Sequence, residues 1–245
     1  MQYQGGKSRI ARPIAEAIRR MYPSATEIWE PFCGGGAVTQ ALAQSGLIVH
    51  ASDSHPDLIL MWQAVKAGDP AAFSDVTKAE YKALLAKVKT DPPSARRGFV
   101  GFGASFGGCW FGGFGRDFKN GDGHQPFQEA QRSIARFRSI IDHVTFSLAD
   151  YRETPDDALV YCDIPYAGTK RYNRGERFDH EAFWLWAAGR SGPTFVSEVS
   201  CPLGWPVAWE KSHRTQMSSN SPATAGAAET ERTERLFHKA ASCTS

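Results

Sequence analysis

Apolar positions in the first 68 residues follow helical and strand periods in turn. Ile10, Ile14 and Ile18 fall on one stripe at helical spacing, so a helix capped by Ser8 is expected to run to Met21. The other elements expected here are strands at 26–32 and 47–51 and helices at 37–45 and 56–67. Strand, helix, strand and helix in this order are typical of a doubly wound nucleotide-binding unit.

The pattern changes after residue 68 and returns at residue 144. Thr77 and Glu80 form a capping box for a helix expected to end near Thr90, and a Gly- and Phe-rich segment follows. Further elements are expected as a helix at 128–142, strands at 144–150, 158–163 and 193–199, a helix from 179, and a final edge strand at 231–239. The sequence therefore predicts one α/β domain, 1–68 and 144–245, with an inserted region at 69–143.

Composition narrows the classes of protein that fit. The chain has 245 residues, of which 42% are hydrophobic, enough for one well-filled core. A net charge of +2 permits nucleic-acid binding without indicating it. The five cysteines form no CxxC pair, so neither a disulfide framework nor a metal site is expected, and a reducing cytoplasm fits best. No secretory signal and no apolar run of membrane-spanning length is found.

A glycine turn and a carboxylate lie where a doubly wound sheet binds ligands. Gly34, Gly35 and Gly36 separate the first expected strand from its helix, which lets a ligand approach the backbone closely. Asp53 ends the second strand at the spacing of a ribose-binding acid. A tight turn and a helix cap before Pro56 are the simpler interpretations. Together, however, the two features favour a ligand that contains adenosine.

A third feature, Asp163-Ile164-Pro165-Tyr166, follows the strand expected at 158–163. Pro165 restricts Ile164 to an extended backbone, which directs its carbonyl group. The Asp163 carboxylate and this carbonyl can hold one NH₂ group between two acceptors, and Tyr166 can stack on the ring that bears it. A strand that simply ends in an Asp-X-Pro turn is the alternative.

Four ordered motifs resemble those of the Dam-like (D12 class) DNA adenine-N6 methyltransferases, especially short phage-type members. They are YQGGK (3–7), EPFCGGGAV (30–38), SDSHPDLI (52–59) and DIPY (163–166), the last resembling the family's catalytic DPPY. Further similarity runs through SFGGCWFGG (105–113), YAGTKRY (166–172), TFVSE (194–198) and TERLF (233–237). The resemblance implies a class I S-adenosylmethionine-dependent methyltransferase fold, a mostly parallel seven-stranded sheet, and transfer of a methyl group to adenine N6 in DNA. It also implies that 1–68 and 144–245 form the catalytic domain and that 69–143 is an inserted target-recognition region.

The resemblance also assigns roles to residues. Catalysis is expected at Asp163, Ile164, Pro165 and Tyr166, and contact with S-adenosylmethionine at Tyr3, Lys7, Phe32, Gly34, Gly36, Asp53, Asp150 and Asp163. The basic residues at the edges of the Gly- and Phe-rich segment are expected to hold DNA phosphates: Arg96, Arg97, Arg116 and Lys119. The expected partner is duplex DNA with a flipped adenine, in the cytoplasm of a bacterial host. The oligomeric state is left open, a monomer being the simplest case.

One position departs from the family pattern. Ile164 stands where the family has its first motif proline, and it supplies the same carbonyl without the fixed φ of proline. Three alternatives therefore stay open at this point. The amine could belong to cytosine N4 or to a protein glutamine, or the chain could be a DNA-binding protein that kept the fold and lost catalysis. The motif order disfavours the first two.

Overall fold

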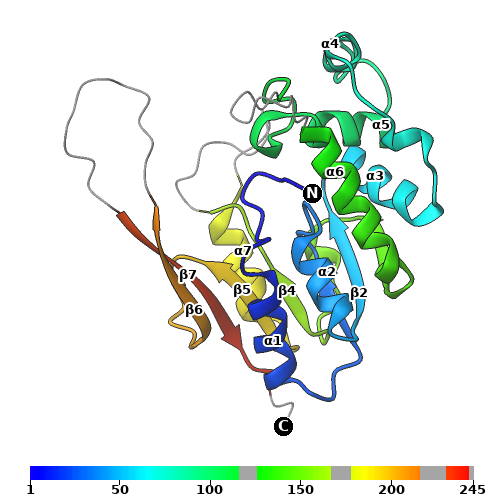
Figure 1. Ribbon diagram of the computed structural model, residues 1–245. Helices are drawn as coiled ribbons and strands as arrows, with labels where there is room; N and C mark the ends of the chain where they lie inside the picture. Colours follow the sequence, from blue (N-terminus) through cyan, green and yellow to red (C-terminus); the bar gives the residue numbers. More distant parts are fainter. Residues whose placement is uncertain (116–125, 167–177, 216–229, 243–245) are drawn as a thin grey trace, which may run out of the picture.

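The structure is a computed structural model and describes residues 1–115, 126–166, 178–215 and 230–242. Within these ranges the strands form one seven-stranded sheet of order β3-β2-β1-β4-β5-β7-β6 (Figure 1). The strands are β1 Glu27–Glu30, β2 Ile48–Asp53, β3 Val144–Leu148, β4 Val160–Cys162, β5 Thr194–Glu198, β6 Val207–Thr215 and β7 Thr230–Lys239. The first five are parallel, and β7 runs antiparallel to β5 and β6. This mixed sheet confirms the class I methyltransferase fold.

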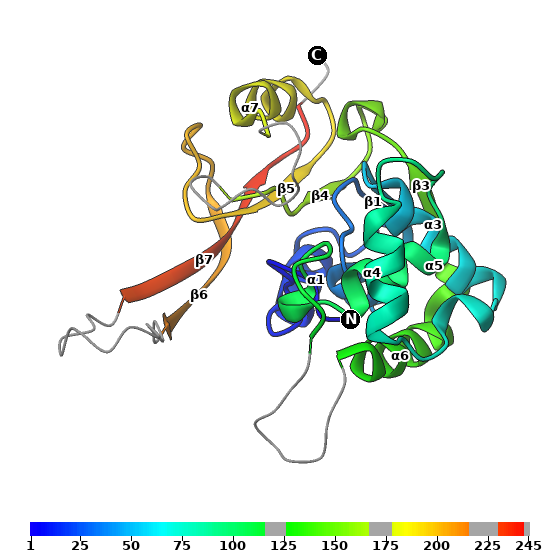
Figure 2. The same cartoon turned by 90° about the horizontal axis from the view of Figure 1, so that it is seen from above.

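Helices cover both faces of the sheet (Figure 2). The α-helices are α1 Ala11–Met21, α2 Ala37–Gln44, α3 Pro56–Ala67, α4 Lys78–Ala86, α5 Ala95–Gly98, α6 Pro126–Phe137 and α7 His180–Gly189. Shorter 3₁₀ and π turns are η1 Ala71–Phe73, η2 Phe99–Gly103, η3 Phe106–Gly108, η4 Arg138–His143 and η5 Tyr151–Glu153. Along β4 the side chains alternate: Tyr161 joins the larger core with α1, α2 and α3, whereas Val160 and Cys162 join a second core with α7.

Local signals set most of the element boundaries. Pro56 occupies the first turn of α3, and Gly68 ends that helix with φ +74°. The Thr77 side chain accepts a hydrogen bond from the Glu80 amide at the start of α4, as predicted. The predicted cap at Ser8 is wrong, because α1 begins at Ala11 after Ile10 and has no side-chain cap.

The carboxyl-terminal half of the sheet differs from the prediction in one respect. The strand expected at 231–239 is present as β7, but it lies between β5 and β6 and not at the edge. The edge strand is β6, Val207–Thr215, which the sequence analysis did not predict. The two strands form a long antiparallel ribbon that extends beyond the rest of the sheet (Figure 1).

The region between α3 and β3 packs directly on the part of the chain that forms the sheet. Its helix α5 lies against α3 (Figure 1), and Gly98 approaches so closely that a Cβ there would lie 2.1 Å from the Asp57 carbonyl oxygen. Tyr81, Phe99 and Phe127 of this region belong to the same hydrophobic core as α1 and α2. The region thus shares its core with the sheet, and its role in target recognition stays a prediction. Among the described residues, no helix is long and apolar enough to cross a membrane.

Candidate active site

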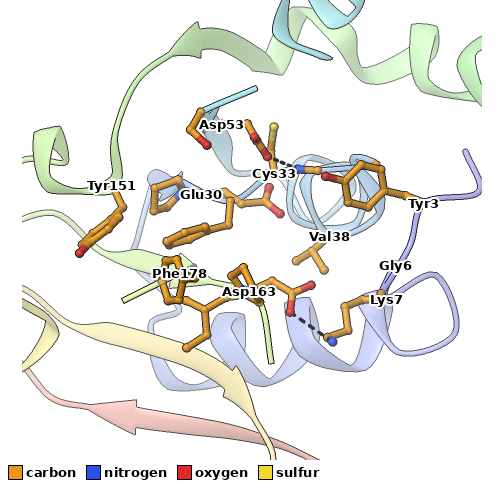
Figure 3. A pocket seen from close by; sticks show the side chains of 18 of the residues that line it. Tyr3, Gly6, Lys7, Glu30, Cys33, Val38, Asp53, Tyr151, Asp163 and Phe178 are labelled. Carbon is orange, nitrogen blue, oxygen red and sulfur yellow. Dashed lines mark hydrogen bonds and ion pairs between the residues drawn. The ribbon is translucent and has the colours of Figure 1, made fainter. Parts of the chain in front are cut away.

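One cavity opens at the carboxyl ends of β1, β2 and β4, where the strand order reverses (Figure 3). Its volume of about 430 Å³ is in the range of sites for small molecules. Open α/β sheets bind their ligands at this switch point. The cavity is lined by most of the residues predicted for the site: Tyr3, Lys7, Phe32, Gly34, Asp53, Asp150, Asp163, Ile164, Pro165 and Tyr166.

The glycine turn forms one wall of the cavity through its backbone. Gly34 has φ +46°, and its carbonyl accepts a hydrogen bond of 3.0 Å from the buried Trp62 indole. Gly36 lies behind the cavity wall as the N-cap of α2, with φ +72°. A Cβ at Gly36 would lie 2.8 Å from the Trp62 ring, so this position requires glycine both for its φ and for space.

Asp53 ends β2 and fixes the turn opposite it. Its Oδ2 accepts a hydrogen bond of 3.1 Å from the Gly34 amide, and its Oδ1 accepts one of 3.0 Å from the His55 amide. Burial raises the pKa of Asp53 to about 6, although these backbone hydrogen bonds lower it. Each carboxylate oxygen has a second lone pair, which leaves Asp53 able to accept hydroxyl groups of a ribose.

Asp163 follows β4 and lies in a buried charged cluster (Figure 3). The Lys7 Nζ lies 3.2 Å from Asp163 Oδ1 and 3.5 Å from Glu234 Oε2. Lys7 also donates a hydrogen bond to the Tyr166 hydroxyl, which in turn donates to Glu234. Burial raises the pKa of Asp163; Lys7 partly offsets this rise, and the charge of Glu234 adds to it.

Ile164 and Pro165 of the DIPY motif also contact the second core and helix α7. The Ile164 side chain is 2% exposed and packs in the second core with Phe183 and Val196. The Pro165 carbonyl accepts a hydrogen bond of 2.7 Å from His180 at the start of α7. Ile164 therefore has a packing role beyond its backbone carbonyl, a role that the sequence did not reveal.

Sequence reasoning assigned no role to three further residues of the cavity. Glu30 ends β1, is 1% exposed, and its Oε2 has no hydrogen-bond partner among the described residues. Burial raises its pKa well above the usual value, and the nearby charge of Asp163 contributes to the rise. Tyr151 and Phe178 pack against Phe32 with ring centroids 5.6 and 5.7 Å away. Glu30 opens the EPFCGGG motif, so its place at a strand end was a signal in the sequence.

Among the residues that the structure describes, acidic side chains outnumber basic ones around the cavity. The carboxylates that line it are Glu30, Asp53, Asp150, Asp163 and Asp179, against the basic side chains of Lys7 and Arg152. Arg152 is paired with Asp150 at 2.6 Å, and Lys7 with Asp163. The remaining surplus of acid suits a ligand that carries positive charge.

The structure engages Arg96 and Arg97 in internal contacts, which argues against the prediction that they hold DNA phosphates. Arg97 is 3% exposed and pairs with Asp57, with Nε–Oδ1 and Nη2–Oδ2 distances of 2.7 and 3.2 Å. Arg96 donates to both carboxylate oxygens of Glu80 and to the carbonyls of Ala72, Ser74 and Asp75. These guanidinium groups hold the region together internally. Arg116 and Lys119 lie outside the described residues.

Comparison with known proteins finds one matching family and two curated relatives. Residues 3–91 match the family described as "D12 class N6 adenine-specific DNA methyltransferase". Two curated relatives, each called "DNA adenine methylase", come from a classical Ogawa strain and an El Tor Inaba strain of Vibrio cholerae serotype O1. Each is 27% identical over 188 residues, which covers 68% of this chain. The chain spans 64% of the length of these relatives.

Solved structures with a similar outline include yhhF of Escherichia coli, described as a methyltransferase, and the glycopeptide N-methyltransferase MtfA. The first has a TM-score of 0.36 and 10% identity, covering 94% of this chain and 86% of its own. The second has a TM-score of 0.35 and 9% identity, covering 94% and 96%. Because these TM-scores and identities are low, the fold is assigned from the strand order of the sheet. The chain is thus similar to the D12 class of N6 adenine-specific DNA methyltransferases over residues 3–91 and to the two DNA adenine methylases over 188 residues, and its strand order is that of a class I methyltransferase fold.

Proposed function

We propose that this protein transfers the methyl group of S-adenosylmethionine to the N6 amine of an adenine flipped out of duplex DNA. The observation that carries the proposal is a shared cavity: Asp163, at the end of β4, faces the same space as the glycine turn and Asp53. Asp163, which can accept a hydrogen bond from an aromatic amine, therefore lines the same cavity as Asp53 and the glycine turn, which suit a cofactor that contains adenosine. The proposed substrate places the protein in the cytoplasm of a bacterial host, and a monomer suffices for this site.

The residues present fit S-adenosylmethionine. Asp53 would accept the ribose hydroxyl groups, and the unpartnered Oε2 of Glu30 would accept the cofactor's ammonium group. Phe32 and Phe178 offer apolar walls to its adenine, and Asp150 lines the same space. The surplus of carboxylates complements the positive sulfonium. When bound, the cofactor supplies an electrophilic methyl group.

The chain's own groups prepare the amine for attack. The lone pair of adenine N6 is delocalised into the ring, which makes it a poor nucleophile. Asp163 and the Ile164 carbonyl would accept its two N–H groups and draw the nitrogen towards tetrahedral geometry, so that the lone pair points at the methyl group. Such preorganised acceptors stabilise charge that develops only in the transition state. Direct in-line transfer requires no covalent enzyme intermediate.

The base must leave the duplex before it can reach this cavity, which costs a few kcal/mol. An aromatic side chain that stacks on the flipped base would return about 1–3 kcal/mol. Tyr166, the predicted stacking residue, lines the cavity but is 7% exposed, with its hydroxyl held by Lys7 and Glu234. Its ring is therefore fixed before the base arrives, which lowers the ordering cost of stacking.

Transfer of tritium-labelled methyl groups to DNA tests this function. Unmethylated duplex DNA should acquire label, and the same DNA already methylated at every adenine N6 should acquire none. Equal labelling of both substrates would indicate another amine, such as cytosine N4. Binding of DNA without any labelling would favour a protein that kept the fold and lost catalysis.

Cofactor affinity is expected to depend on pH through Asp53. Its pKa is raised to about 6, so the carboxylate is ionised above this pH and protonated below it. Because the ionised form accepts hydroxyl hydrogen bonds more strongly, affinity should be full above about pH 7 and fall as pH drops through 6. Asp53→Asn should bind at least about tenfold more weakly at pH 7.5 and lose the inflection near 6. Calorimetric titration of both proteins with cofactor measures this, and an unchanged inflection would remove Asp53 from the ribose site.

Contact with DNA phosphates remains proposed for Arg116 and Lys119. Replacing both with Ala should reduce the slope of log affinity against log salt by about 0.9 for each lost contact. Arg96→Ala serves as the control, because its guanidinium is bound internally and the slope should not change. Fluorescence anisotropy with labelled duplex DNA at a series of salt concentrations gives the slopes. The same slope in wild type and double variant would contradict these contacts.

A further inference from the structure

Glu234 lies beside the proposed site but does not line its cavity. It comes from β7, near the carboxyl end of the chain, and its side chain reaches Lys7 and Tyr166. In sequence, Tyr166 is 159 residues from Lys7 and 68 from Glu234. The pairing joins the amino-terminal segment, the end of β4 and the antiparallel ribbon in one buried cluster.

This cluster offers one acceptor for each of the three N–H donors of the Lys7 ammonium group. An ammonium group has three N–H donors and no acceptor. Three acceptors surround it: the Tyr166 hydroxyl, Asp163 Oδ1 at 3.2 Å and Glu234 Oε2 at 3.5 Å. Lys7 is 6% exposed, so little water competes for these donors. Its ammonium is therefore held on three sides and shared between two carboxylates.

Glu234 also sets the direction of the hydrogen bonds. The Tyr166 hydroxyl accepts from Lys7 and donates its own proton to Glu234. These two hydrogen bonds hold the Tyr166 ring and the Lys7 ammonium in place relative to each other. Lys7 contacts Oδ1 of Asp163, and the carboxylate has further lone pairs with which it can accept a hydrogen bond from a substrate amine.

We propose that Glu234 is a positioning residue for methyl transfer: it shares the Lys7 ammonium with Asp163 and fixes the Tyr166 ring, so that the Asp163 carboxylate remains a strong acceptor for the amine. This inference rests on the proposed function. Without the charge of Glu234, Lys7 would pair with Asp163 alone. A carboxylate with an undivided ammonium partner is a weaker acceptor for a second donor.

The charge of Glu234 contributes to the raised pKa of Asp163, together with burial and against the effect of Lys7. Removing that charge should therefore lower the pH at which Asp163 titrates. Among the described residues, the titratable and charged groups around the pair include Lys7, Glu30, Tyr161, Cys162 and Tyr166, with Lys211 opposite Glu234 in the β6–β7 register. All of these remain in a Glu234→Gln variant, so the change isolates one charge.

Carbon-13 NMR of the protein labelled at aspartate side-chain carboxyls gives the test without cofactor or DNA, with Asp163→Asn identifying the signal. In Glu234→Gln, whose amide oxygen still accepts from Tyr166, the midpoint of Asp163 should move to lower pH. The matched control is Glu210→Gln on β6, which removes an ion pair with Arg235, 3.2 Å away on the neighbouring strand. It should leave the midpoint unchanged. An unmoved midpoint in Glu234→Gln would overturn the inference.

A second variant and a second readout keep the inference separate from folding and from the proposed function. Glu234→Asp keeps a carboxylate in the cluster, so the midpoint of Asp163 should stay nearer to that of the wild type than in Glu234→Gln. Equal displacement of the midpoint in both variants would overturn the inference. The single-turnover methylation rate should fall about tenfold in Glu234→Gln and return towards wild type in Glu234→Asp. A wild type that transfers no methyl group would refute the proposed function, whereas the two titrations decide the role of Glu234 by themselves.

Discussion

Replacement of Asp163 by Ala should reduce the single-turnover rate of methyl transfer by about 10²- to 10³-fold. The variant removes one of two acceptors proposed to act in the transition state, and loss of one preorganised hydrogen-bonding group at such a site costs about this much. Single-turnover rates with bound DNA and saturating cofactor isolate the chemical step.

A matched carboxylate-to-alanine change on the ribbon, Glu210→Ala, should leave the rate unchanged, because this residue pairs with the exposed Arg235 outside the cavity. Full activity of Asp163→Ala would contradict the proposed mechanism. Equal losses in both variants would indicate a general effect on the fold.

The largest effect on stability is expected for Arg97→Ala, which should lower the free energy of unfolding by about 3–5 kcal/mol. The change leaves the 4%-exposed Asp57 as a buried charge without its partner. It also removes the donor to the carbonyls of Lys87 and Asp91. Urea unfolding followed by circular dichroism measures the difference.

Arg136→Ala is the matched control, because its pair with Glu129 is exposed and such pairs contribute about 0–1 kcal/mol. A loss below 1 kcal/mol for Arg97→Ala, with a reduced salt dependence of DNA binding, would contradict the internal role of Arg97. Such a result would indicate that Arg97 contacts DNA phosphates.

The fold could be predicted best where local chemistry decides it. From β1 to α3 each boundary has its own signal, such as Gly36 before α2, Pro56 at the start of α3 and Gly68 at its end. Strand β6 carried no such signal. Its segment VAWEKSHRT mixes apolar and charged residues, and its strand conformation comes from pairing with β7, a contact between residues far apart in sequence.

The residues of the site also divide into those that have a local signal in the sequence and those that do not. Asp53 and Asp163 could be predicted because each ends a strand, and parallel strands bring such ends to one edge of the sheet. The functions of Arg97 and Glu234 could not, because they depend on partners 40 and 68 residues away, Asp57 and Tyr166. A guanidinium at the edge of a glycine-rich segment has the same appearance in sequence whether it contacts a phosphate or a buried carboxylate.

Identification of the methylated nucleoside tests the central claim most directly. The protein would be incubated with unmethylated duplex DNA and cofactor carrying a deuterated methyl group, and the DNA then digested to nucleosides for mass spectrometry. We expect deuterated N6-methyl-2′-deoxyadenosine, formed at least about 100-fold more slowly when Asp163→Ala replaces the wild type. Deuterated N4-methyl-2′-deoxycytidine, or DNA without any deuterated nucleoside, would contradict the claim that Asp163 and Ile164 hold an adenine amine for methylation.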